Sequence, residues 1–192
     1  MCCVDYGRSS RIKEHLGEVT TSNSVPVQPE VRTEHLNKLL QLAELLSQTE
    51  PRQALVSASE AMKLAKSLSN QGALAQSLRW LGSSHYFLSE YELALKCSLE
   101  AVEISKQLED LLTTSECERI CGLVYLDQGK LSEALERFEV SLELSQSLQN
   151  ASGVSSALNN IAIIYYAFEE NERALEYHTR NLQLSKSIGN II

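Results

Sequence analysis

The sequence predicts an all-α protein, built as a solenoid of about four antiparallel helix hairpins, and three observations support this. Residues of one kind recur at intervals of 40, as Ala54, Ala94, Ala134 and Ala174 do. Apolar residues from position 31 onward recur with the spacing of a helix face. No proline follows Pro51, so helices can run unbroken through the rest of the chain. A fixed period of this length is the signature of stacked repeats.

The same register relates further positions to one another. Each of the four alanines is followed by leucine, and a small residue followed three positions later by a ring recurs as Gly82 with His85, Gly122 with Tyr125, and Ala162 with Tyr165. Four units are therefore expected, at about 35–74, 75–114, 115–154 and 155–192. Residues 1–30 contain Gly, Ser, Thr and two prolines without a helical period, so we expect them to form a flexible leader.

Eight helices are expected, at about 36–46, 51–68, 73–88, 90–108, 113–127, 131–148, 152–168 and 171–188. The first ends where Pro51 suits the first turn of the second. Ser89 with Glu92, and Thr113 with Glu116, have the spacing of capping boxes at the starts of the fourth and fifth helices. A Gln-Gly-Lys turn precedes the sixth. Asn or Asp at positions 70, 110, 150 and 190 marks the end of each unit.

Charge and cysteine content exclude several classes of protein. The net charge is −8 and the pI about 5.1, and no cluster of Lys or Arg exceeds two residues, which disfavours nucleic-acid binding. No apolar run approaches the roughly 20 residues of a membrane span, and residues 1–10 lack the apolar segment of a secretory signal. An odd number of cysteines without an export signal indicates reduced thiols and a cytoplasmic protein; they are Cys2, Cys3, Cys97, Cys117 and Cys121.

The residues that could carry chemistry have simpler roles in the repeat. His85 stands where Tyr125 and Tyr165 stand, and His178 stands where Phe138 stands, so both histidines are expected to be packing residues. Cys117 and Cys121 share a helix face and could bind a metal with Cys97 or a histidine, but no second paired motif supports this, and buried cysteines are common as small apolar residues. The eight glycines form no phosphate loop. No enzyme, metal or cofactor is expected.

The units resemble tetratricopeptide (TPR) repeats over residues 35–192. The third unit carries Cys121-Gly122, then Tyr125, and on its second helix Ala134 and Phe138, as the family pattern requires. The resemblance implies a right-handed, TPR-like superhelix. The 40-residue form is similar to the repeats of kinesin light chain, of Pins/LGN-type spindle adaptors, and of arrays that precede output domains in bacterial cyclases, histidine kinases and transcription regulators. Glu118, where a large apolar residue is usual, and Leu42, where a small one is usual, depart from the pattern.

The resemblance also implies a binding surface, because the first helix of each hairpin lines the concave groove in this family. The groove positions carried over by register are Gln76, Arg79, Ser83, Tyr86, Glu116, Arg119, Leu123, Leu126, Ser156, Asn159, Ile163 and Tyr166. Arg79 and Arg119 would select an acidic peptide or a chain terminus; alternatively, each forms an ion pair with a neighbouring glutamate such as Glu116 or Glu118. Asn159 and Asn160 resemble the asparagine with which long-repeat adaptors hold a ligand backbone.

The expected function is that of a non-catalytic scaffold that binds a peptide or protein segment, as the sensing or adaptor part of a longer signalling protein. One alternative is a self-association module. Another is an N-terminal regulatory fragment of an enzyme such as a nucleotide cyclase or histidine kinase. The last helix carries Leu175, Leu182, Leu184 and Ile188 and lacks a capping helix, so its apolar strip is expected to be covered by further repeats, an output domain or a second copy.

Overall fold

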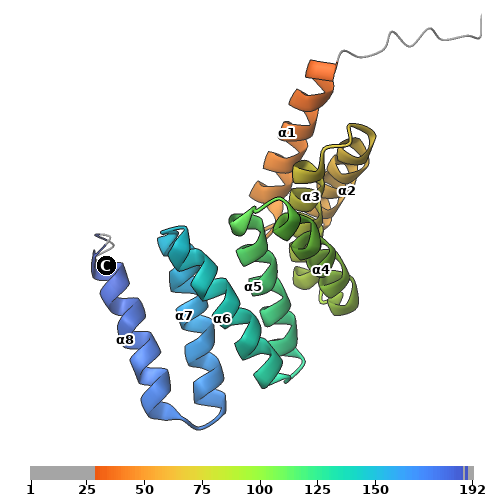
Figure 1. The fold of residues 1–192 in the computed structure, drawn as a ribbon. Coiled ribbons are helices and arrows are strands. Elements are labelled where there is room, and N and C mark those ends of the chain that lie inside the picture. Colours follow the sequence, from red (N-terminus) through yellow and green to blue (C-terminus); the bar gives the residue numbers. More distant parts are fainter. Residues whose placement is uncertain (1–28, 188, 190–192) are drawn as a thin grey trace, which may run out of the picture.

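The computed structural model describes residues 29–187 and 189, and in this part of the chain it has eight α-helices in series and no strand (Figure 1). This confirms the all-α solenoid. The helices are α1 (Pro29–Leu46), α2 (Pro51–Ser67), α3 (Gln71–Phe87), α4 (Tyr91–Gln107), α5 (Leu111–Asp127), α6 (Leu131–Ser147), α7 (Ala151–Ala167) and α8 (Asn171–Ser187). Residues 1–28 of the expected leader lie outside the described residues, and α1 begins seven residues before the expected position 36.

The first helices of the hairpins form the inner layer of the solenoid. Each helix packs on the next in sequence, and in addition α1 packs on α3, α3 on α5 and α5 on α7. Within the described residues the second helices α2, α4, α6 and α8 make no such contacts with one another. The row whose members touch is the inside of the curve, so the inward side chains of α1, α3, α5 and α7 form the concave surface.

One kind of joint recurs at every helix end. The residue two positions after the last helical residue has a positive φ, and the joints are 20 residues apart; the residues are Ser69, Ser89, Glu109, Gly129, Gln149, Glu169 and Gly189. At the first joint the N–H of Asn70 donates to the carbonyl of Ala65 at 3.0 Å, and that of Ser69 to Lys66 at 3.1 Å. These are the two bonds of a Schellman motif, which satisfies carbonyls at the helix end. The constant joint explains why the repeat has no insertions.

The helix starts differ from the expected capping boxes, which are wrong. Ser89 has φ 59° and belongs to the preceding joint, and Thr113 lies inside α5. The N-caps with side-chain bonds are instead Asn70, Asp110 and Asn150, whose Oδ1 atoms accept from the N–H three residues later at 2.9, 3.0 and 3.2 Å. These residues, predicted to end a unit, therefore start the first helix of the next one.

The small residues of the repeat permit close approach of the two helices of a hairpin. A Cβ atom placed on Gly82 would come within 2.3 Å of Oγ of Ser98, and the ring of Phe138 lies as closely against Gly122. Phe138 is fully buried because α5 and α7 both pack on α6. His178, at the same register in α8, is exposed, so the expectation that it packs is wrong. Within the described residues no helix follows α8 to cover it.

Glu118 is a buried charge at the place where the family pattern has an apolar residue. Its side chain is 1% exposed, and its two oxygens accept from Arg137 of α6 at 2.9 Å and from Lys106 of α4 at 3.3 Å. A buried carboxylate requires such partners. The three side chains therefore link three successive helices of the solenoid.

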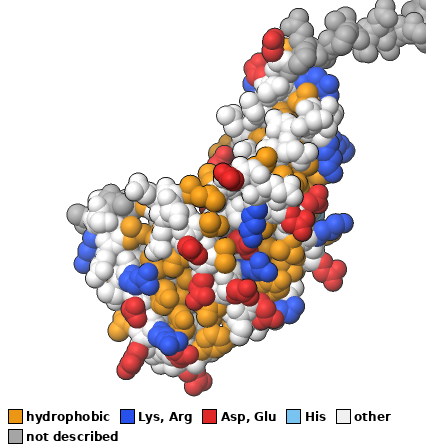
Figure 2. Space-filling view, viewed as in Figure 1, with side chains coloured by type: hydrophobic (Ala, Val, Ile, Leu, Met, Phe, Trp, Pro, Cys, Tyr) orange, Lys and Arg blue, Asp and Glu red, His pale blue; other side chains and the backbone are white. Residues whose placement is uncertain are grey.

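The last helix leaves an apolar row uncovered. Leu175 and Leu182 are 67% and 55% exposed, whereas Val102 and Leu142, which occupy the register of Leu182 in α4 and α6, are 5% and 8% exposed. Leu184 is half-buried, and Ile188 lies outside the described residues. On the face seen in Figure 2, acidic and basic side chains are interspersed with apolar ones. None of the described helices is both long and apolar enough to cross a membrane.

Candidate functional site

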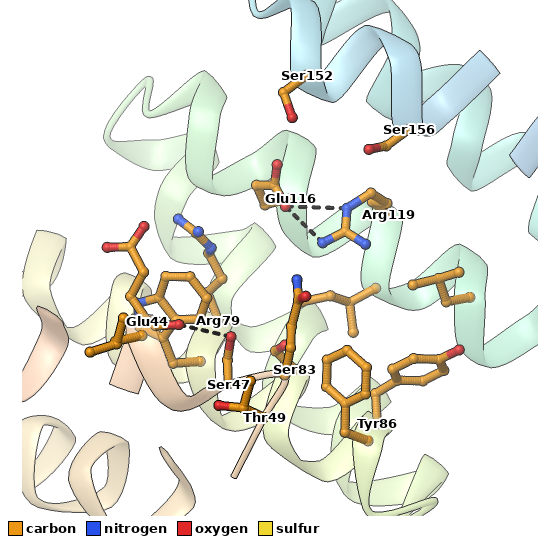
Figure 3. A pocket seen from close by; sticks show the side chains of 16 residues that line it. Glu44, Ser47, Thr49, Arg79, Ser83, Tyr86, Glu116, Arg119, Ser152 and Ser156 are labelled. Carbon is orange, nitrogen blue, oxygen red and sulfur yellow. Dashed lines mark hydrogen bonds and ion pairs between the residues drawn. The ribbon is translucent and has the colours of Figure 1, made fainter. Parts of the chain in front are cut away.

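The concave surface is hollowed into a cavity of about 480 Å³ that spans four helices (Figure 3). Its wall comes from the end of α1, from α3 and α5, and from the start of α7. The lining residues are Glu44, Leu45, Ser47, Gln48, Thr49, Arg79, Trp80, Ser83, Tyr86, Phe87, Glu116, Arg119, Ile120, Leu123, Ser152 and Ser156. A second cavity of about 380 Å³ shares Glu44, Arg79 and Trp80 with the first and extends to Gln76 and Asp110.

Arg119 of α5 is already paired with a carboxylate of the protein. Oε2 of Glu116, one turn earlier, accepts from Nη2 of Arg119 at 2.9 Å and from Nε at 3.2 Å. Both side chains are largely enclosed, at 20% and 25% exposure. In Figure 3 the pair lies between α3 and the serines Ser152 and Ser156 of α7. For Arg119 the alternative of an ion pair with Glu116 is therefore what the structure contains.

Arg79 of α3 differs from Arg119 in this respect. Within the described residues it forms no ion pair, and its guanidinium carbon lies 3.9 Å from the centroid of the Trp80 ring. A guanidinium over an aromatic face is held in place while its N–H donors remain available. Arg79 is thus a cation of the cavity wall that no protein carboxylate neutralises.

Rings and aliphatic side chains form the other end of the cavity. Tyr86 and Phe87 contact each other edge to face, with ring centroids 5.4 Å apart, and Leu45 and Leu123 line the same cavity. Burial, and after it the negative charge of Asp127, raise the pKa of Tyr86 to about 12. The phenol therefore stays protonated at neutral pH and can donate a hydrogen bond. The cavity combines an apolar end with one unneutralised cation.

The predicted groove residues divide into two groups. Arg79, Ser83, Tyr86, Glu116, Arg119, Leu123 and Ser156 line the large cavity, and Gln76 lines the second one. The other predicted positions line neither of these cavities: they are Leu126, Asn159, Asn160, Ile163 and Tyr166. Ile163 and Tyr166 are exposed on α7. The structure thus gathers the predicted residues of α3 and α5 and separates them from most of those of α7.

Sequence reasoning missed two sets of lining residues. Trp80 and Phe87 follow Arg79 and Tyr86 by one position, and the i, i+3, i+4, i+7 pattern of a helix face would have included them. The C-terminal end of α1, which contributes Glu44 and Leu45, carried no signal of this kind because the first unit departs from the repeat pattern.

The cysteines of the inner helices have no reactive surroundings. Burial raises the pKa of Cys117, and burial followed by the charge of Glu118 raises that of Cys121 to about 12. Among residues 29–187 and 189, no three His, Cys, Asp or Glu side chains are grouped as metal ligands would be. A thiol with a raised pKa is a poor nucleophile at neutral pH.

Comparison with known proteins identifies the repeat. Two family models described as tetratricopeptide repeat match residues 73–147 and 154–188. Comparison with curated proteins gives no match.

Three solved structures share the fold. They are aspartyl phosphate phosphatase F from Bacillus subtilis (TM-score 0.75, 17% identity), a Rap protein complexed with Competence and Sporulation Factor (0.76, 18%), and the Rap conjugation gene regulator of plasmid pLS20 in complex with the Phr* peptide (0.66, 16%). They match 83%, 83% and 86% of this chain, which spans only 42%, 44% and 47% of theirs. At these identities the likeness concerns the fold.

Proposed function

The chain belongs to the tetratricopeptide repeat family, and from that premise we propose that it is a non-catalytic scaffold that binds a peptide or protein segment in the cavity between α1, α3, α5 and α7. The Rap conjugation regulator has a peptide in its complex, and this chain shares its fold over 86% of its length. Arrays of stacked repeats present extended concave surfaces that serve for binding.

The observation that carries the proposal is the pairing of Arg79 with an apolar end in one cavity. Arg79 presents a planar set of donors that fits a carboxylate, and Tyr86, Phe87 and Leu123 offer apolar contact. An acidic side chain or chain terminus followed by an apolar residue matches both features. We further propose that the scaffold is the sensing or adaptor part of a longer signalling protein, in agreement with the larger size of the matched structures.

The test is retention of labelled random decapeptides from an acidic and a neutral library on the immobilised protein. The wild type should retain the acidic library, and Arg79→Glu should lose it without a change in melting temperature. Arg52→Glu is the matched control, because Arg52 is exposed at the start of α2, outside both cavities, and the net charge changes equally. Equal loss in both variants would mean that only net charge matters. Full retention by Arg79→Glu would contradict the proposal.

The exposed row on α8 favours a second candidate function, self-association with another copy of this chain. Leu175 and Leu182 form the row. At the other end of the array, α1 carries the Glu34–Lys38 ion pair, at the register positions that in α5 face α4. An α8-to-α8 contact would bury both apolar rows with two-fold symmetry, whereas an α1-to-α8 contact would place leucines against charges.

A further inference from the structure

We propose that Glu116 is an internal competitor for acidic ligands: by occupying Arg119, its carboxylate sets how many negative charges the cavity accepts. This inference rests on the proposed function and deepens it, because it assigns a specificity-determining role within the same site. It concerns one cavity that contains two arginines, of which only one is neutralised by the protein.

The geometry makes Glu116 part of the binding surface. Glu116 and Arg119 both line the cavity from α5, and a single oxygen of Glu116 contacts two nitrogens of Arg119. Figure 3 shows the pair between Arg79 on one side and Ser152 and Ser156 on the other. A segment that runs across the cavity from α3 to α7 therefore passes directly over this pair.

The charges decide which ligand fits. A first carboxylate of the ligand can bind Arg79, which has no ion pair within the described residues. A second carboxylate at the α5 side would meet an arginine whose charge is already balanced, and it would be repelled by Glu116. As built, the cavity thus favours a segment with one negative charge, followed by uncharged residues at the α5 side.

The chain contains a matched pair that separates this role from simple helix stabilisation. Glu170 and Arg173 have the same i, i+3 spacing, with a contact of 3.0 Å, and line neither cavity. An i, i+3 pair supports its own helix wherever it lies. Neutralising Glu170 therefore reproduces the loss of a helix ion pair without changing the cavity.

The experiment measures fluorescence anisotropy with three fluorescein-labelled hexapeptide amides, Gly-Ser-Leu-Phe-Gln-Gln, Gly-Ser-Leu-Phe-Glu-Gln and Gly-Ser-Leu-Phe-Glu-Glu. Glu116→Gln should tighten binding of the two-carboxylate probe by about fivefold, the size expected for a partly exposed ion pair. It should change binding of the other two probes by less than about twofold. Glu170→Gln should change none of the three.

A double variant tests whether the effect passes through Arg119. In Glu116→Gln/Arg119→Gln the gain should disappear, and thermal unfolding confirms that the variants are folded. An unchanged or weaker affinity of Glu116→Gln for the two-carboxylate probe overturns the inference. If neither protein binds any probe while the wild type still retains the acidic library, the inference is wrong and the proposed function stands. If the library is not retained either, both are wrong.

Discussion

Gly122 of α5 lies directly against the ring of Phe138 on α6: a Cβ atom at position 122 would come within 2.7 Å of Cε1 and 2.8 Å of Cδ1 of that ring. The ring is fully buried, so it has no free space into which to move. The hairpin is closed by this contact between a backbone without a side chain and the largest buried side chain of the array.

Gly122→Ala should therefore destabilise the protein by about 1–3 kcal/mol, although alanine favours helices. Urea unfolding followed by circular dichroism measures this. Gly72→Ala is the control, because a Cβ at position 72 meets its nearest neighbour, Oδ1 of Asn70, at an ordinary 3.7 Å. Gly72→Ala should be neutral or stabilising by up to about 1 kcal/mol. A stable Gly122→Ala protein would show that the helices can separate at no cost.

The recurring joints predict that some glycine substitutions stabilise the protein. Glu109 and Glu169 have φ values of 55° and 63°, which are strained for residues with a side chain. Glu109→Gly and Glu169→Gly should each raise the free energy of unfolding by about 0.5–1 kcal/mol. Gly129→Ala, at φ 73° and with no atom within 4 Å of its Cβ, should lower it by about 1 kcal/mol. The opposite sign in either case would contradict the assigned joint geometry.

The buried carboxylate of Glu118 predicts strong coupling between two substitutions. Arg137→Met leaves Glu118 with Lys106 alone and should cost about 2–4 kcal/mol. Glu118→Met with Arg137→Met removes the buried charge and should recover most of that loss. A double-mutant cycle in urea gives the coupling energy. Additive effects of the two substitutions would mean that the ion pair contributes nothing beyond its separate side chains.

How far the sequence predicts this protein depends on which interactions repeat. The helices, the hairpins and the close approach at Gly122 recur every 40 residues, so the register alone identifies them. Ser89 illustrates a failure: capping-box spacing and a Schellman joint compete for the same residue, and the joint forms because it satisfies carbonyls of the preceding helix. His178 was misjudged because its burial depends on a neighbouring helix, which the register of its own helix does not reveal.

The site was predictable where it follows the register of a helix face, and not where it depends on curvature. Arg79 and Arg119 were expected in the groove and both line the cavity, but only their surroundings distinguish them: one lies over a ring and the other against Glu116. Asn159 and Asn160 have the expected register yet line neither cavity. The cavity closes onto the end of α1, and this depends on how each hairpin is rotated relative to the previous one.

The raised thiol pKa values predict an effect of alkaline pH. Cys117 and Cys121 stay protonated in the folded state when an unfolded thiol, with a pKa of about 9, ionises. Their stabilising contribution is complete below pH 9 and is lost as the pH rises, at about 1.4 kcal/mol per pH unit for each thiol. At pH 8, iodoacetamide should modify half-buried Cys97 before either of them, which peptide mass spectrometry can follow. Equal rates at all three would contradict this.

The exposed row on α8 predicts the behaviour of the protein in solution. If a second copy covers Leu175 and Leu182, sedimentation at micromolar concentration should show a dimer, and Leu182→Glu should convert it to a monomer. The control is Leu45→Glu on α1, where an equally exposed leucine lies at the opposite end of the array and outside the row. A wild-type monomer whose solubility and stability are unaffected by Leu182→Glu would exclude self-association through α8.

The position of Arg79 over Trp80 has a practical consequence, because Trp80 is the single tryptophan of the chain. All indole fluorescence of the protein arises from the wall of the cavity, within contact of the one cation there that no carboxylate of the described residues neutralises. A carboxylate that draws the guanidinium away from the ring changes the surroundings of the fluorophore directly. The unlabelled protein thus carries its own optical sensor for occupancy of the cavity.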